Sequence, residues 1–144
     1  MTGINPYINF NGQAEAAFNF YKSVFGGEFA TLSRMKEMPP SKECEISDVE
    51  KEKVMHVSLP LSNGAVLMGS DVPESYANKM TFGNNISISI NAESREETNK
   101  LFNGLSDGGT VTMPLGDTFW GAYFGMFTDK FGINWMVNCD NNPK

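Results

Sequence analysis

The stretch Asn5–Gly27 reads NPYINFNGQAEAAFNFYKSVFGG and carries the signals that decide the fold. Within it, Asn5–Phe10 alternates polar with apolar residues, which predicts a half-buried strand. From Ala14 onward the apolar residues recur at the spacing of one helical face, so a helix is expected next. Gly26 and Gly27 are expected to end that helix, because glycine adopts the left-handed backbone conformation without a steric penalty.

The rest of the first half predicts three more strands. Phe29–Ser33, Val54–Leu61 and Ala65–Ser70 have extended character. The Asn-Gly pair in Ser62–Gly64 favours a tight hairpin between the last two. Lys36–Lys53 is acidic and interrupted by prolines, so it predicts a loop. The first half therefore reads β-α-β-β-β.

The second half repeats this order roughly 80 residues later, as an internal duplication would. Asn85–Ile90 alternates as a strand does, and Ser94 with Glu97 forms a capping box that begins a helix. Further strands are predicted at Thr110–Met113, Phe119–Thr128 and Ile133–Asn138.

Three segments, Tyr7–Gly12, Ala17–Glu28 and Thr118–Asn138, resemble the PhnB-like branch of the vicinal oxygen chelate superfamily. That superfamily contains glyoxalase I, the fosfomycin-resistance proteins, the extradiol dioxygenases and the bleomycin-binding proteins. The resemblance implies an α+β fold in a single domain, 1–144, made of two tandem βαβββ modules at about 1–78 and 83–141. It further implies a cup-shaped, mostly antiparallel eight-stranded sheet, with helices on the convex face and a pocket in the concave face.

Enzymes of that superfamily hold a divalent metal with four side chains. The resemblance places the corresponding positions between Asn5 and Tyr7 and on or near Met68, Asn85 and Met136. None of these residues is His, Asp or Glu, and the chain has one histidine. Thioether and amide groups are poor ligands for metals of this class. We therefore expect no metal and no other cofactor, which speaks against glyoxalase, fosfomycin-transferase and dioxygenase mechanisms.

Strand alternation predicts which side chains enter the pocket. If Met55 and Val57 face the core, His56 and Ser58 face the concave side. By the same rule, the isoleucines of Asn85–Ile90 face the helices and its polar residues face the pocket. Such a polar, uncharged floor suits a small organic ligand. The residues predicted to bind the ligand are Tyr7, Asn9, His56, Ser58, Met68, Asn85, Ser87, Trp120, Tyr123 and Met136.

His56 is the best single candidate for a catalytic residue, because imidazole groups exchange protons near neutral pH. A hydrogen-bonded wall residue explains the same position without catalysis. No second histidine is present to activate a cysteine or serine nucleophile. Trp120 and Tyr123 bring aromatic surface to one rim, where a planar ligand or a second subunit could pack, although aromatic clusters also form cores.

Charge and composition exclude several partners. Lys and Arg total 11 against 17 for Asp and Glu, giving a net charge of −6, so nucleic acid is not expected. Neither a signal-peptide pattern nor an apolar run of membrane-spanning length is present, so no membrane partner is expected. Cys44 and Cys139 lack a metal or disulfide spacing, which indicates reduced thiols in a cytoplasmic protein. Exposed strand edges and superfamily habit indicate a homodimer.

These observations favour a metal-independent protein that binds a small, partly apolar molecule. One alternative is a lyase or isomerase in which His56 shuttles a proton. Another is a resistance protein that sequesters a cationic antibiotic in an acidic dimer groove. Methyltransferase chemistry, for which some relatives are labelled, is not expected, because no glycine-rich turn is available for S-adenosylmethionine. Phosphonate chemistry lacks its Arg or Lys cluster.

Overall fold

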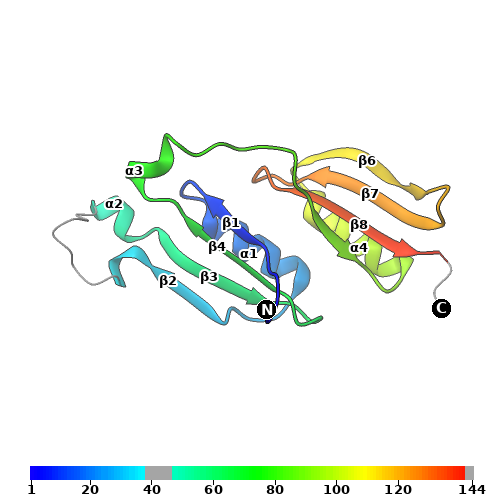
Figure 1. Ribbon diagram of the computed structural model, residues 1–144, viewed down its shortest axis with the longest axis horizontal. Coiled ribbons are helices and arrows are strands. Elements are labelled where there is room, and N and C mark those ends of the chain that lie inside the picture. Colours follow the sequence, from blue (N-terminus) through cyan, green and yellow to red (C-terminus); the bar gives the residue numbers. More distant parts are fainter. Residues whose placement is uncertain (38–46, 142–144) are drawn as a thin grey trace. The chain divides into compact units, whose positions relative to one another are not determined.

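The N-terminal half forms a four-stranded mixed sheet with one long helix against it (Figure 1). The computed structural model describes residues 1–37 and 47–141. β1 runs parallel to β4, whereas β3 is antiparallel to both β4 and β2. In spatial order the strands are β1 (Tyr7–Phe10), β4 (Val66–Asp71), β3 (Val54–Pro60) and β2 (Thr31–Arg34).

Helix α1 (Ala14–Phe25) has the bounds that its apolar spacing predicts. Its buried side chains include Ala17, Phe18 and Tyr21, which lie against β3 and β4. Phe18 meets Tyr21 edge-on at 5.5 Å between ring centroids. Gly26 ends the helix with φ at +80°, a value that favours glycine.

Short helical turns occupy the ends of the predicted loop Lys36–Lys53. The 3₁₀ turn η1 (Met35–Glu37) follows β2, and α2 (Asp48–Lys51) precedes β3. Ser47 caps α2 by accepting a hydrogen bond from the backbone N–H of Glu50 at 3.3 Å. The middle of the loop, 38–46, which includes Cys44, lies outside the described residues. A third turn, α3 (Glu74–Ala77), follows β4.

The C-terminal half repeats the same plan. In spatial order its sheet is β5 (Ile88–Asn91), β8 (Asn134–Asp140), β7 (Ala122–Thr128) and β6 (Thr110–Asp117), with β5 parallel to β8 and the other pairs antiparallel. Helix α4 (Arg95–Ser106) lies against β7 and β8 (Figure 1).

The predicted capping box at the start of α4 forms in part. Ser94 Oγ accepts a hydrogen bond from the Glu97 backbone N–H at 3.0 Å, as predicted. Glu97 Oε1 accepts from the backbone N–H of Glu93 at 3.2 Å, one residue earlier than the box predicts. The Ser94 cap still supplies an acceptor at the N-terminus of α4.

The chain divides into two compact units, Met1–Met80 and Thr81–Lys144. Each unit contains one βαβββ module with its own four-stranded sheet. The predicted α+β fold with two such modules is thereby confirmed. No helix in residues 1–37 and 47–141 is long and apolar enough to cross a membrane.

Candidate functional site

In the first unit, a glycine shows which face of the sheet α1 covers. A Cβ added to Gly69 would lie 2.7 Å from Cε2 of Phe18 in α1. Gly69 is paired with Ile8 in β1 and with Val57 in β3, so all three lie on the helix-covered face. We call the opposite face of each sheet its open face. Strand alternation places Tyr7, Asn9, Ser58 and Met68 on the open face of the first sheet, as predicted.

His56 and Tyr7 make a direct contact on this open face. The Tyr7 hydroxyl oxygen and His56 Nδ1 are 3.2 Å apart. The two rings are nearly parallel, with an interplanar angle of 25° and centroids 5.7 Å apart. Tyr7 and His56 are 49 positions apart in the chain, and both belong to the predicted ligand-binding set.

Four open-face residues, one from each strand, form a continuous row across the first sheet. Tyr7 is opposite Met68, Met68 is opposite Ser58, and Ser58 is opposite Thr31. Met68 is half-buried and Ser58 is buried, whereas Asn9 one step along β1 is exposed. The row crosses all four strands without a charged side chain.

One face assignment in β3 is wrong. Met55 was expected to face the core, but Val54 is fully buried and Met55 is only half-buried. The register between β2 and β3 shifts after the Ser33 and His56 pair, so that Arg34 is opposite Val54 and Met55 has no partner. An irregularity of this kind inserts one residue and reverses the alternation beyond it.

In the second unit, the corresponding close approach is at Gly125. An added Cβ there would lie 2.7 Å from Cε2 of Phe102 in α4. Gly125 is opposite Val137, and both therefore lie on the helix-covered face. Met126 and Met136, which are opposite each other, lie on the open face.

A row of methionines crosses this second open face. Met113 of β6 is opposite Met126 of β7, which is opposite Met136 of β8, which is opposite Ser89 of β5. Met126 and Met136 are half-buried, and Met113 is 45% exposed. Of these three methionines, strand alternation predicted only Met136 to enter the pocket. The Met-Phe-Thr and Trp-Met-Val segments show no periodic signal that would reveal that their methionines are opposite each other.

Trp120 extends the apolar part of this face. It lies in the turn between β6 and β7 with 59% of its surface exposed. Its ring meets Phe124 edge-on, with the centroids 5.9 Å apart. Phe124 is opposite Asn138 on the open face, and the prediction for the pocket omitted it from the ligand-binding set.

The predicted position of Tyr123 is wrong, because its side chain lies on the helix-covered face. Tyr123 is opposite the buried Cys139. Its hydroxyl donates to Asn99 Oδ1 of α4 at 2.6 Å, and the Arg95 guanidinium lies 3.9 Å from its ring centroid. These α4 partners account for a tyrosine on a face that otherwise packs apolar groups.

The start of β5 also differs from the prediction. The strand begins at Ile88, the residue opposite Trp135, and not at Asn85. Asn85 lies in a bend before the strand and is exposed, and Ile86 is 78% exposed and does not face α4. Ser87 precedes the strand and is half-buried. The alternation of polar and apolar residues therefore begins at Asn85, before the residue at which pairing with β8 begins.

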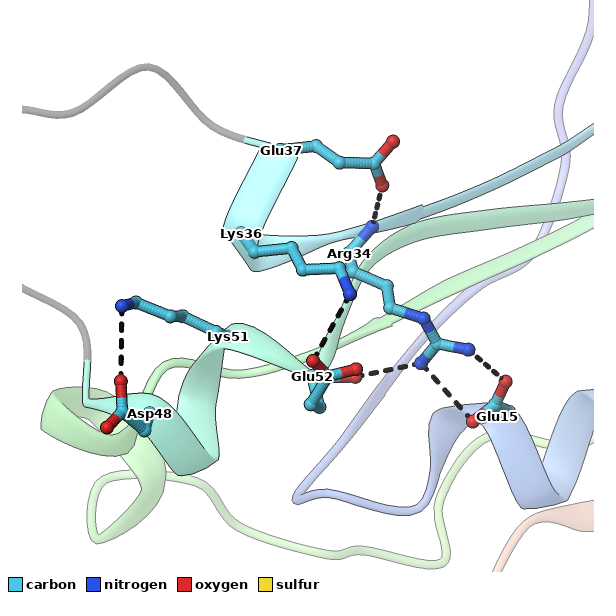
Figure 2. A network of polar contacts seen from close by, with 7 residues as sticks. All are labelled: Glu15, Arg34, Lys36, Glu37, Asp48, Lys51 and Glu52. Atoms are coloured by element: carbon cyan, nitrogen blue, oxygen red, sulfur yellow. Dashed lines mark hydrogen bonds and ion pairs between the residues drawn. The ribbon is translucent and has the colours of Figure 1, made fainter.

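Charged groups of the first unit gather at the end of β2 and around α2 (Figure 2). Arg34 donates to the two carboxylate oxygens of Glu15 at 3.3 and 2.5 Å and to the backbone oxygen of Glu52 at 2.9 Å. Lys36 pairs with Glu52 at 3.2 Å. The hydrogen bond from Arg34 lowers the pKa of the Glu15 carboxyl. Because Glu15 belongs to α1, this pair lies on the helix-covered side.

The second unit has a similar pair on the same side. Arg95 donates to Asp117 Oδ1 at 2.7 Å, and the Asn141 amide donates to the same oxygen at 2.9 Å. The hydrogen bond from Arg95, and then that from Asn141, lowers the pKa of the Asp117 carboxyl. Asp117 is opposite Tyr123 on the helix-covered face, so this charge too lies away from the open face.

The described residues contain no group of three His, Cys, Asp or Glu side chains that could hold a metal ion. The four positions that correspond to superfamily metal ligands fall on open-face or preceding residues with amide, phenol or thioether side chains. His56 is the one imidazole, and its Nδ1 is engaged by Tyr7. This donor set does not fit the divalent metals of the superfamily.

Comparison with known proteins agrees with this fold. A family model described as 3-demethylubiquinone-9 3-methyltransferase matches residues 2–138. The chain is 26% identical to protein YjdN of Escherichia coli (strain K12) over 141 residues, covering 94% of this chain and 93% of that protein.

Solved structures give the same result. Protein PA1353 from Pseudomonas aeruginosa is 40% identical, with a TM-score of 0.82 and coverage of 97% of this chain and 98% of that chain. A PhnB protein from Bacillus cereus is 32% identical, with a TM-score of 0.74 and coverage of 96% and 99%.

A glyoxalase/bleomycin resistance protein/dioxygenase family enzyme from Burkholderia phytofirmans PsJN shares the fold at 16% identity, with a TM-score of 0.60 and coverage of 93% of this chain and 96% of that chain. The chain therefore belongs to the 3-demethylubiquinone-9 3-methyltransferase (PhnB-like) family.

Proposed function

We propose that this PhnB- and YjdN-like protein binds a small, partly apolar molecule on the open faces of its sheets, without a divalent metal. The observation that carries the proposal is the chemistry of those faces. The open-face residues named above offer hydroxyl, amide and imidazole groups beside thioethers and aromatic rings, and alternation adds one acid, Asp140, at the exposed end of β8. Ligand pockets are typically built from apolar surface with a few uncharged polar groups.

The methionine row supports the partly apolar character of the ligand. Thioether side chains are flexible and polarisable, and they adapt to apolar or aromatic groups of different shapes. Met113, Met126 and Met136 lie side by side on one face, and Trp120 and Phe124 add aromatic surface next to them.

Two substitutions on β6 test the proposal directly. Met113 and Val111 are both 45% exposed, but Met113 is opposite Met126 on the open face and Val111 is opposite Phe127 on the helix-covered face. We expect Met113→Lys to reduce several-fold the amount of small molecule that co-purifies with the protein, measured by mass spectrometry of an organic extract. Val111→Lys is the matched control and should retain it. If both variants retained the small molecule equally, the open face of the second sheet would be excluded as its binding surface.

Metal independence has its own test. Elemental analysis of the purified protein should find no stoichiometric zinc, nickel, manganese or iron, because amide and thioether groups occupy the corresponding positions. One equivalent of such a metal, removed by a chelator with loss of the co-purifying molecule, would contradict this part of the proposal.

The contact between Tyr7 and His56 favours a second candidate, a lyase or isomerase in which His56 moves a proton. The hydrogen bond at 3.2 Å fixes the ring on the open face, as proton transfer requires. The co-purifying molecule, incubated in D₂O, should then gain deuterium at carbon with the wild-type protein and not with His56→Gln. Equal incorporation by both proteins would remove this candidate.

We further propose that the protein acts as a homodimer in the cytoplasm. Each sheet has two edge strands, β1 and β2 in the first and β5 and β6 in the second. Val111 and Met113 expose apolar surface on the β6 edge. Unpaired strand edges favour association with another chain.

A further inference from the structure

The two ring nitrogens of His56 differ: Nδ1 has a hydrogen-bond partner, and Nε2 has none among the described residues. Nδ1 lies 3.2 Å from the Tyr7 hydroxyl oxygen, and the nearly parallel rings hold the two groups in register. No described residue makes a hydrogen bond to Nε2. Ser33, which is opposite His56 on β2, donates its hydroxyl to the His56 backbone oxygen at 3.4 Å and so does not engage the ring.

The direction of this hydrogen bond decides where the imidazole proton lies. A neutral imidazole has one N–H donor and one nitrogen lone pair. A phenol is a good donor and a poor acceptor, because its oxygen lone pair is delocalised into the ring. If Tyr7 donates to Nδ1 of His56, the single proton of the neutral ring is on Nε2.

We infer that Tyr7 is a positioning residue that holds His56 in the Nε2–H form, and that the ligand places a carbonyl or carboxylate oxygen against this N–H. The ligand class rests on the proposed function, whereas the proton position does not. His56 in this form offers a donor on the open face and withholds the lone pair that a base or a metal ligand would need. A bound oxygen that gains negative charge would be stabilised by the hydrogen bond from this N–H, and the proton would stay on the ring.

The surroundings of His56 agree with an acceptor on the ligand. Open-face neighbours on β1, β2, β3 and β4 include Tyr7, Ser33, Ser58, Met68 and Ser70, which are uncharged. A half-buried N–H donor without a protein acceptor is satisfied by water in the free protein and by a ligand oxygen in the complex. A wholly apolar ligand would leave this donor unsatisfied.

Because the chain has a single histidine, nuclear magnetic resonance can read the proton position without assignment ambiguity. Long-range ¹H–¹⁵N correlations of the uniformly labelled protein, recorded above the pH at which the ring is protonated, distinguish the two neutral forms. We expect the Nε2–H form in the wild-type protein and a shift toward a mixture in Tyr7→Phe. Tyr76→Phe, an exposed tyrosine of α3, is the matched control and should leave the spectrum unchanged.

An Nδ1–H form in the wild-type protein would overturn the inference, and this result does not depend on the folding of any variant. A spectrum of Tyr7→Phe identical to that of the wild type would overturn the positioning role, provided that the backbone amide spectrum shows a folded protein.

Two isosteric probes test the ligand class. Acetophenone carries a carbonyl oxygen where α-methylstyrene carries a CH₂ group. We expect acetophenone to shift the His56 ring signals and to bind about five- to tenfold more tightly than α-methylstyrene, as one additional hydrogen bond predicts. The preference should disappear in His56→Phe.

The probes separate this inference from the proposed function. Equal binding of both probes, with shifts of the methionine methyl signals but not of His56, would overturn the acceptor inference and leave the proposed function standing. Failure of both probes to shift His56 or any methionine methyl signal would overturn the ligand class. The co-purification experiment would then decide the proposed function.

Discussion

Gly69 marks the closest approach between α1 and its sheet. An added Cβ would lie 2.7 Å from Phe18 Cε2 and 2.8 Å from the Ile8 backbone oxygen. We expect Gly69→Ala to lower the free energy of unfolding by about 1–3 kcal/mol, because the backbone oxygen cannot move aside as a side chain could. Urea denaturation measures this change.

Gly116 provides the matched control for that substitution. It also lies in a strand, β6, but a Cβ there would meet no atom within 4 Å. Gly116→Ala should change the free energy of unfolding by less than about 0.5 kcal/mol. If the two variants were equally stable, the close packing of α1 on Gly69 would be contradicted.

Asp71 is a second residue on which the local structure depends. The residue is 4% exposed, and its carboxylate accepts hydrogen bonds at 2.9 Å from two backbone N–H groups, those of Ala14 and Val54. We expect Asp71→Asn to destabilise the protein by about 1–3 kcal/mol, because an amide has one acceptor and its NH₂ group would face an N–H donor. Asp48→Asn, at an exposed carboxylate, should change the denaturation midpoint little. Similar losses in both variants would contradict this role of Asp71.

At the scale of elements, an ion pair joins the long helix of each unit to the end of an edge strand, and the acid and the base exchange places between the two units. In the first unit the acid is on the helix, Glu15 of α1, and the base is on the strand, Arg34 of β2 (Figure 2). In the second unit the base is on the helix, Arg95 of α4, and the acid is on the strand, Asp117 of β6. The duplicated modules thus keep the connection while exchanging the charges.

The Glu15 and Arg34 pair predicts a small pH dependence of stability. The hydrogen bond from Arg34 lowers the pKa of Glu15 in the folded protein. A lowered folded-state pKa stabilises the fold above the unfolded-state pKa, and this stabilisation is lost as the pH falls through the folded-state pKa. Since the Glu15 side chain is 46% exposed, solvent screening limits the effect to at most about 0.5 kcal/mol.

We therefore expect Glu15→Gln to be slightly less stable than the wild type near neutral pH and equally stable in acid, as measured by urea denaturation across that range. Glu28→Gln, at a glutamate whose side chain is 86% exposed, should follow the wild type throughout. A stability difference for Glu15→Gln that grows toward acid pH would have the wrong sign for this pair.

At the scale of the whole molecule, the proposed homodimer predicts a species of about twice 15.9 kDa. Light scattering at micromolar concentrations measures it. Because the exposed apolar residues of β6 lie on an edge strand, Val111→Lys combined with Met113→Lys should shift the mass toward one chain if β6 takes part. A single-chain mass for the wild-type protein would remove the proposal of a dimer.

Local sequence signals were sufficient for the order of the eight strands and the two long helices and for the bounds of α1. The apolar spacing from Ala14 and the stop at Gly26 act within a few residues, so no distant contact is needed to interpret them. Within strand centres, alternation also placed Ser58, Met68 and Met136 on the correct face.

Only the tertiary structure decided where that alternation begins, where it is reversed and which open-face residues meet. Pairing with β8 starts β5 at Ile88, a shift in register leaves Met55 without a partner, and α4 draws Tyr123 to its own side. The contact of Tyr7 with His56 likewise joins separate strands. The physical reason is that helix ends and turns are set by local backbone preferences, whereas strand register is set by hydrogen bonds to strands that the local sequence does not contain.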